Sequence, residues 1–286
     1  MRTFLASAAL VSCLVAVAIS AQAGRENAKE QVHFHHVHLN VSDIEATTTF
    51  YGKIFGTLPV SYANKTPALL TEHYFLFLNQ APKPIKSQLL TGIIHVGWSG
   101  IDGQSEYAWW QKQGIEFRTP LSKVGTGEFM YFWGPDREVI EIWTNERHHR
   151  FNHVHLLASS PERSARWFAE IIADPSALEV GNPDFGNFNV HIDSITLHVF
   201  PDIPRYTPRE REGTMQVTDG STIDHIAFAV RDLRVAFSRL KKLGIDVVKP
   251  IAASHELGFR HFFVRSPDGV LVEFVEAKPF PESMWE

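Results

Sequence analysis

An internal duplication is the feature of this sequence that most restricts its fold. Residues 36–39 (His-Val-His-Leu) return at 153–156 in identical form, and residues 94–96 (Ile-His-Val) are matched at 224–226 by Asp-His-Ile. Similar offsets in the same order indicate a duplicated chain with small changes in loop length. The two predicted domains are residues 33–146 and 151–277.

Each half also divides into two similar units. Residues 36–41 alternate apolar and polar side chains as a strand does, and Ser42-Asp43 then resembles a helix cap before the amphipathic stretch 44–55. Further strand patterns follow, and the whole order then repeats. The sequence therefore predicts four β-α-β-β-β modules, which belong to the α+β class because helices interrupt largely antiparallel strands.

Composition and the first residues restrict the class of protein. The chain has 286 residues, a net charge of −5 and no basic patch, so nucleic acid is not expected as a partner. Residues 1–23 combine Arg2, an apolar run and an Ala-Gln-Ala cleavage pattern, which predicts a signal peptide and a secreted or periplasmic protein. The single cysteine, Cys13, lies inside this segment. No other stretch is long and apolar enough to predict a membrane span.

Three residues able to bind a divalent metal recur at matching places in the two halves. A single histidine on a strand is usually explained by packing, but a recurring set of two imidazoles and one carboxylate on strands can form a facial metal site with open positions. We therefore expect one site in each half. The predicted ligands are His36, His95 and Glu141 in the first half and His153, His225 and Glu273 in the second.

These motifs carry a resemblance to a known family. The pattern His-Val-x-Leu-x-Val before Ser-Asp, a helix with Phe-Tyr, a later histidine on a strand, and a final Pro-Asp followed by a glutamate resembles the vicinal oxygen chelate superfamily. That superfamily includes glyoxalase I, fosfomycin-resistance proteins, bleomycin-binding proteins and extradiol dioxygenases. The resemblance spans nearly all of the chain after residue 33. It implies paired modules whose cupped sheets surround a metal that a substrate chelates through its oxygens.

The second half is most similar to the extradiol dioxygenases. Their spacing implies acid/base roles for His198 and His255, although His198 also stands where glyoxalase I has a fourth metal ligand. Phe263 replaces the tyrosine of that family, whereas the first half keeps Tyr131 at the matching place. The first half has Lys123 and Phe77 where the second has His255 and His198, so the second half is expected to be the main reaction centre. His38 and His155 share a face with the metal histidines, and contact with a metal ligand, contact with a substrate, or simple packing explains them.

Several functions remain open at this level. The favoured interpretation is an enzyme of dioxygenase or lyase type, with Fe or Mn as the expected divalent metal and Zn or Ni as alternatives, acting on a small oxygen-chelating molecule. A glyoxalase-type lyase is the first alternative, and a non-catalytic protein that binds an antibiotic-like molecule is the second. A third interpretation makes one half catalytic and the other a structural relic. Either a monomer or a homodimer is compatible with the tandem arrangement.

Overall fold

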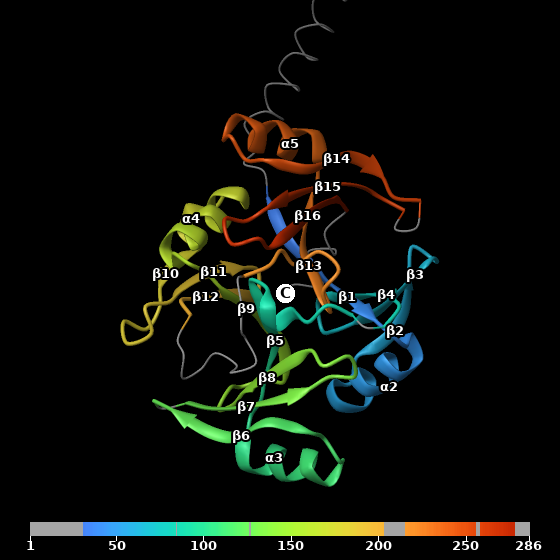
Figure 1. The fold of residues 1–286 in the computed structure, drawn as a ribbon, viewed down its shortest axis with the longest axis vertical. Coiled ribbons are helices and arrows are strands. Elements are labelled where there is room, and N and C mark those ends of the chain that lie inside the picture. The colour runs from blue at the N-terminus through green and yellow to red at the C-terminus, as the bar shows by residue number, and fades with distance from the viewer. Residues whose placement is uncertain (1–30, 84, 126, 203–214, 256–257, 278–286) are drawn as a thin grey trace, which may run out of the picture. The chain divides into compact units, whose positions relative to one another are not determined.

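The four modules predicted from the sequence are present and follow one another along the chain (Figure 1). The computed structural model describes residues 31–83, 85–125, 127–202, 215–255 and 258–277, and the predicted signal peptide lies outside them. Each module begins with a long strand; these strands are β1 (Val32–Val41), β5 (Ile93–Ser99), β9 (Arg150–Leu157) and β13 (Ile223–Val230). A helix follows each of them: α2 (Ile44–Phe55), α3 (Gly103–Lys112), α4 (Pro161–Ile171) and α5 (Leu233–Lys242).

Three further strands complete each module. In the first half they are β2 (Leu58–Tyr62), β3 (Thr66–Leu70) and β4 (Phe75–Gln80), then β6 (Phe117–Val124), β7 (Gly127–Trp133) and β8 (Val139–Trp143). In the second half they are β10 (Leu178–Val180), β11 (Phe188–Ile192) and β12 (Ile195–Phe200), then β14 (Val247–Ala253), β15 (Arg260–Arg265) and β16 (Leu271–Glu276). Two short 3-10 turns are η1 (Gln88–Leu90) and η2 (Pro175–Ala177).

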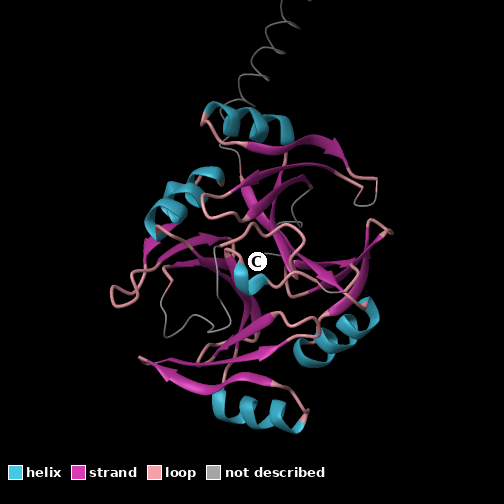
Figure 2. Ribbon diagram, viewed as in Figure 1, coloured by secondary structure: helices cyan, strands magenta, loops and turns pink. Residues whose placement is uncertain are grey.

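The helices begin where the sequence supplies a cap. The Asp43 carboxylate accepts the backbone N–H of Ala46, and Asp102 and Asp232 accept N–H groups at the starts of α3 and α5. Helix α2 ends at Gly56, whose φ of 68° suits glycine. The four helices lie on the outside of the strands (Figure 2). Within the described ranges, none of the helices is long and apolar enough to cross a membrane.

The modules exchange partners between the two halves of the chain. One eight-stranded sheet has the order β14-β15-β16-β13-β1-β4-β3-β2, and the other has the order β10-β11-β12-β9-β5-β8-β7-β6. The first module therefore shares a sheet with the fourth, through antiparallel pairing of β1 with β13, and the second shares a sheet with the third, through β5 and β9.

The two predicted domains, residues 33–146 and 151–277, therefore do not each form a separate sheet. The duplication shows which modules are alike, but similarity does not decide which first strands pair. The connection from β8 to β9 is short, so β9 turns back directly beside β5. With β5 and β9 paired, the inner edges left by β1 and β13 pair with each other.

A continuous apolar core joins the elements from Val32 onward. Phe34 on β1 packs its ring 5.2 Å from Tyr74, 6.2 Å from Phe151 and 6.1 Å from Phe228, so residues of three modules meet around it. The Asp193 carboxylate adds polar contacts beside this cluster, accepting the backbone N–H of Phe34 at 2.8 Å. The first strands of the first, third and fourth modules, which belong to both sheets, thus pack against a shared core.

Candidate metal centres

The exchange of modules regroups the predicted metal ligands. The inner site, built by the second and third modules, contains His95, Glu141 and His153. The outer site, built by the first and fourth modules, contains His36, His225 and Glu273. The residue types of the two predicted triads are therefore preserved, but their grouping within each half was wrong, because each site draws its ligands from both repeats.

Strand register explains why these side chains converge. In the inner sheet, Gly97 on β5 lies between His153 on β9 and Glu141 on β8, and in the outer sheet Ala227 holds the same place between His36 and Glu273. A Cβ atom on Gly97 would come within 2.0 Å of the His153 ring. Glycine at position 97 is therefore what allows the imidazole of His153 to lie across the neighbouring strand.

In the inner site the donor atoms surround a single carboxylate. Glu141 Oε2 lies 2.7 Å from His95 Nε2 and 3.0 Å from His153 Nε2. His155 Nδ1 lies 2.8 Å from His95 Nε2, so this histidine joins the cluster. Ligand atoms from His95, Glu141, His153 and His155 all lie within 4.8 Å of one another. His155 therefore contacts a predicted metal ligand, which is one of the alternatives that the sequence left open for it.

The protonation states in the inner site suit a divalent cation. Burial, together with the neighbouring His155, lowers the pKa of His95 to about 3, and burial also lowers the pKa of His155. Burial opposes ionisation of Glu141, but the charge of His95 and the hydrogen bonds from the histidines hold its pKa well below the ordinary value. Neutral imidazoles and an ionised carboxylate are the forms that coordinate Fe, Mn, Zn or Ni, so the residues present fit such a metal.

Asparagine side chains orient two histidines of this site. Asn152 Oδ1 lies 2.8 Å from His153 Nδ1, and Asn189 Oδ1 lies 2.8 Å from His198 Nδ1. An acceptor at Nδ1 favours the tautomer that carries its proton there and leaves Nε2 as the nitrogen available to the site. The sequence motifs did not single out Asn152 or Asn189, since neither residue type stands out without a known neighbour.

A cavity of about 810 Å³ opens beside the inner site. Its wall includes the ligands His95, Glu141 and His153, and also His198 and Tyr131. The His198 ring lies 5.2 Å from that of His153, and the Tyr131 ring lies 5.1 Å from that of His95. Further aromatic and cationic side chains line the cavity: Arg118, Phe129, Trp143, Arg150, Phe185 and Phe200.

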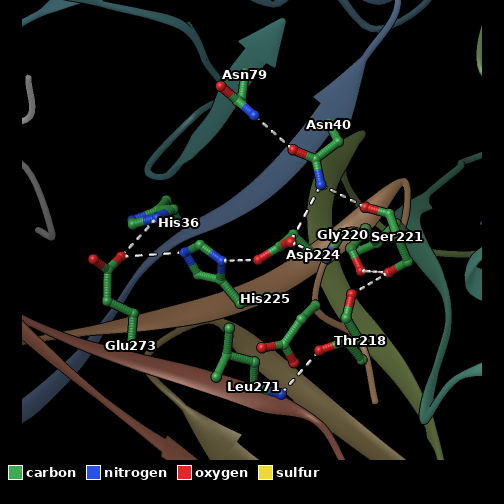
Figure 3. A network of polar contacts seen from close by, with 12 residues as sticks. His36, Asn40, Asn79, Thr218, Gly220, Ser221, Asp224, His225, Leu271 and Glu273 are labelled. Atoms are coloured by element: carbon green, nitrogen blue, oxygen red, sulfur yellow. Dashed lines mark hydrogen bonds and ion pairs between the residues drawn. The ribbon is translucent and has the colours of Figure 1, made fainter. Parts of the chain in front are cut away.

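The outer site has a similar ligand geometry but different surroundings (Figure 3). Glu273 Oε2 lies 3.2 Å from His36 Nε2 and 3.3 Å from His225 Nε2. His225 Nδ1 lies 2.6 Å from Asp224 Oδ1. Burial opposes protonation of His225, but its hydrogen bonds to Asp224 and Glu273 outweigh burial and raise its pKa to about 9. Without a metal, the outer site is therefore an ion pair between His225 and the two carboxylates.

Aromatic rings fill the outer site on the side where the inner site has its cavity wall. Phe77 stacks on the His36 ring with centroids 4.1 Å apart, and Phe263 lies 5.3 Å from His225. Strand register places Phe77 beside His38 as it places His198 beside His155, so Phe77 is the counterpart of His198. Likewise Phe263 pairs with Glu273 as Tyr131 pairs with Glu141.

The predicted proton-transfer residues do not all meet. His198 and Tyr131, from different repeats, line the same cavity. His255 is exposed beyond β14 in the other sheet, where its carbonyl oxygen accepts Lys65 Nζ at 2.7 Å. The prediction that His255 and His198 serve one centre was wrong, because the exchange of modules separates them. The expected primacy of the second half also fails, since the open site takes His95 and Glu141 from the first.

Comparison with known proteins supports the fold and the family. The sequence profile of the Glyoxalase/Bleomycin resistance protein/Dioxygenase superfamily matches residues 33–142 and 150–274. The chain belongs to this superfamily, as the motifs predicted, and it is a tandem member with two matched segments.

Individual relatives are more distant. A lactoylglutathione lyase from Pseudomonas aeruginosa is 29% identical over 150 residues, covering 44% of this chain and 82% of that protein. Glyoxalase I from Zea mays superposes with a TM-score of 0.68 at 15% identity, over 89% of this chain and 96% of that one. A presumed dioxygenase from Bacillus subtilis superposes with a TM-score of 0.62 at 16% identity, over 91% of each chain. At these identities the two structures establish similarity of fold alone.

Proposed function

We propose that the inner site is the reaction centre of a metal-dependent enzyme that acts on a small oxygen-chelating molecule by dioxygenase or lyase chemistry. One observation carries the proposal: the His95–Glu141–His153 cluster opens into an 810 Å³ cavity that also contains His198 and Tyr131. Metal ligands, a proton-transfer group and space for a substrate occur together there. Cavities of this size are typical of small-molecule sites.

His95, His153 and Glu141 would hold the metal, with His155 completing or supporting the set. A bound divalent ion would supply a Lewis acid to the adjacent oxygens of the substrate. We favour Fe or Mn because the donors are imidazole and carboxylate, and Zn or Ni suit the same set.

His198 is suited to accept a proton from the substrate. Burial and the nearby His153 keep the pKa of His198 well below its ordinary value, so the ring is neutral and its Nε2 is available as a base. Asn189 holds the ring in this orientation. Tyr131 can donate a hydrogen bond to a substrate oxygen from the opposite wall, where its ring packs against His95.

Different observations favour the two kinds of chemistry. Aromatic rings on several sides of the cavity suit a planar ring as substrate, which supports the dioxygenase assignment. The similarity to the Pseudomonas aeruginosa lactoylglutathione lyase supports a lyase. A non-catalytic protein that traps a metal-chelating ligand would need the metal and the cavity but not a proton acceptor at His198.

The test uses the full chain reconstituted separately with Fe²⁺ and with Zn²⁺ or Ni²⁺. Oxygen uptake with catechols tests the first chemistry, and loss of the hemithioacetal of methylglyoxal and glutathione tests the second. We expect turnover in one assay, lost in Glu141→Gln and retained in Glu162→Gln, which changes an exposed carboxylate on α4. Saturable binding of a chelator without turnover in any metal form would replace the enzyme by a binding protein.

We also propose that the chain is exported and cleaved after Ala23, as its first residues predict. Both sites are complete within one chain, so a monomer suffices for the chemistry. The mass of the mature protein tests the cleavage, and its light-scattering mass distinguishes a monomer from a homodimer.

A further inference from the structure

The outer site keeps its metal ligands although it has lost the groups that would act on a substrate. His36, His225 and Glu273 occupy the same strand positions as the inner ligands, whereas phenylalanines occupy the positions of His198 and Tyr131. A site that had lost both functions would have no need of two imidazoles and a carboxylate in its core. The presence of these three ligands in the outer site therefore needs an explanation of its own.

The donor atoms of the outer site point toward a shared space. His36 Nε2 is buried and makes no hydrogen bond to a described residue, although Glu273 Oε2 lies only 3.2 Å away. The two atoms are thus close enough to bind one ion together. His38 Nδ1 is buried and lacks a hydrogen bond to the described residues as well, and ligand atoms of His36, His38 and His225 lie within 4.8 Å of one another.

His36, His225 and Glu273 are also contacted at the side-chain atom that faces away from the other ligands. His35 Nδ1 lies 2.8 Å from His36 Nδ1, and Asp224 contacts the Nδ1 of His225. His261 Nδ1 contacts the Oε1 atom of Glu273, leaving Oε2 to face the histidines. The far nitrogen or oxygen of His36, His225 and Glu273 thus has a partner, which fixes the orientation of the near atom, as is typical of metal ligands.

The support of His225 continues into a polar network that is partly buried. The Asp224 carboxylate also accepts the backbone N–H of Gly220, and Asn40 Nδ2 lies 3.2 Å from it (Figure 3). Asn79 Nδ2 in turn donates to Asn40 Oδ1 at 2.8 Å. The network joins β4 to β1 and β13, and the last two are the strands where the first and fourth modules meet.

Protein encloses His36, His225 and Glu273, whereas His38 beside them is half-buried. His36 is 0% exposed, Glu273 is 1% exposed and Phe77 is 0% exposed. Phe77 covers one face of the His36 ring, and Phe259 and Tyr62 pack with Phe77 and Phe75 in a second aromatic cluster over β1 and β4. An ion at this position would be enclosed by protein, whereas an ion in the inner site would face a cavity.

We propose that the outer site binds a divalent metal as a closed structural centre, which ties the first module to the fourth and exchanges its ion slowly. Its ligands are His36, His225 and Glu273, with His38 as the fourth donor. His35, Asp224 and His261 position these ligands. This inference does not rest on the proposed reaction, because it concerns metal binding in the absence of any substrate.

The test measures the release of Zn²⁺ from the fully loaded mature chain to an excess of a chromogenic chelator. We expect two ions per chain and two phases, the slow phase at least about tenfold slower because release requires local unfolding. Glu141→Gln should remove the fast phase alone, and Glu273→Gln the slow phase alone. Phe77→Ala serves as the second variant: it leaves the ligands in place and should convert the slow phase into a fast one with both ions still bound.

The melting temperature gives an independent readout. Zn²⁺ should raise the Tm of Glu141→Gln, which keeps the outer site, more than that of Glu273→Gln. One ion per chain that persists in Glu273→Gln, or a slow phase removed by Glu141→Gln, would overturn the proposal. A release rate unaffected by Phe77→Ala would overturn the closed character of the site.

Discussion

Glu138 is a buried carboxylate outside both metal centres for which the structure predicts a pH effect on stability. It lies in the turn before β8, three residues from the inner ligand Glu141, and only 1% of its surface is exposed. Its Oε1 accepts the Tyr51 hydroxyl at 2.9 Å, and its Oε2 accepts the backbone N–H of Asp136 at 2.9 Å. Burial outweighs these hydrogen bonds and raises the pKa of Glu138 to about 7.

The direction of the effect follows from the raised pKa. Between pH 4.5, the ordinary value, and about pH 7, the folded chain keeps a proton that the unfolded chain has released. The contribution of Glu138 to the unfolding free energy is therefore most favourable below pH 4.5, and it falls as the pH rises from 4.5 to about 7. At about 1.4 kcal/mol per pH unit, the ionisation of Glu138 costs about 3 kcal/mol of unfolding free energy at neutral pH.

Glu138→Gln removes this cost and introduces a smaller one. The amide can still accept the Tyr51 hydroxyl, but its NH₂ group would face the N–H of Asp136, which costs about 1 kcal/mol. We expect the two proteins to have nearly equal stability at pH 5, where ionisation of Glu138 costs about 1 kcal/mol, and the variant to be more stable by about 2 kcal/mol at pH 8.

Urea unfolding followed by tryptophan fluorescence, at several pH values from 5 to 8 and with both proteins in the same metal-loaded state, measures the difference. Other titrating groups cancel because only the difference between the two proteins is used. A difference that does not change with pH would refute the reasoning that Glu138 is buried and carries a raised pKa.

Three further substitutions test the sites and the core. Gly97→Ala should displace the His153 ring and lose the inner metal only, which elemental analysis would show as one ion per chain; two retained ions would contradict the close approach. Asn189→Leu should lower kcat more than tenfold in the assay that shows turnover, with metal content unchanged, because His198 loses its orientation; unchanged kcat would remove His198 from the proposed reaction. Asp193→Ala should lower the unfolding free energy by about 1–2 kcal/mol, because it leaves a backbone N–H of β1 unpaired; an unchanged urea midpoint would contradict this.

Much of the fold could be predicted from the sequence because the duplication repeats local patterns. Alternation on β1, the cap at Asp43 and the amphipathic stretch after it are each set by neighbouring residues, and four copies made them recognisable. Pairing of β1 with β13 depends on contacts between residues almost 200 positions apart. Similar modules offer several such pairings, so the sequence alone did not decide between them.

In the candidate sites too, local features could be predicted from the sequence, whereas contacts between distant strands could not. The ligands could be predicted as residue types at recurring strand positions, but their grouping required the pairing of the strands. His261 was missed, although period-2 alternation places it on the same face of β15 as Phe263, which the sequence comparison had already considered. The filling of the outer site by Phe77 depends on packing across β1 and β4, and the sequence shows only that a histidine is missing there.

The most direct test of this account is the metal content of single and double variants whose substitutions lie in different repeats. Glu141→Ala and His153→Ala should each reduce two ions per chain to one. Because both residues belong to the inner site, the double variant should still bind one ion. If the double variant bound none, each repeat would hold its own ion, and the assembly of the sites from exchanged modules would be contradicted.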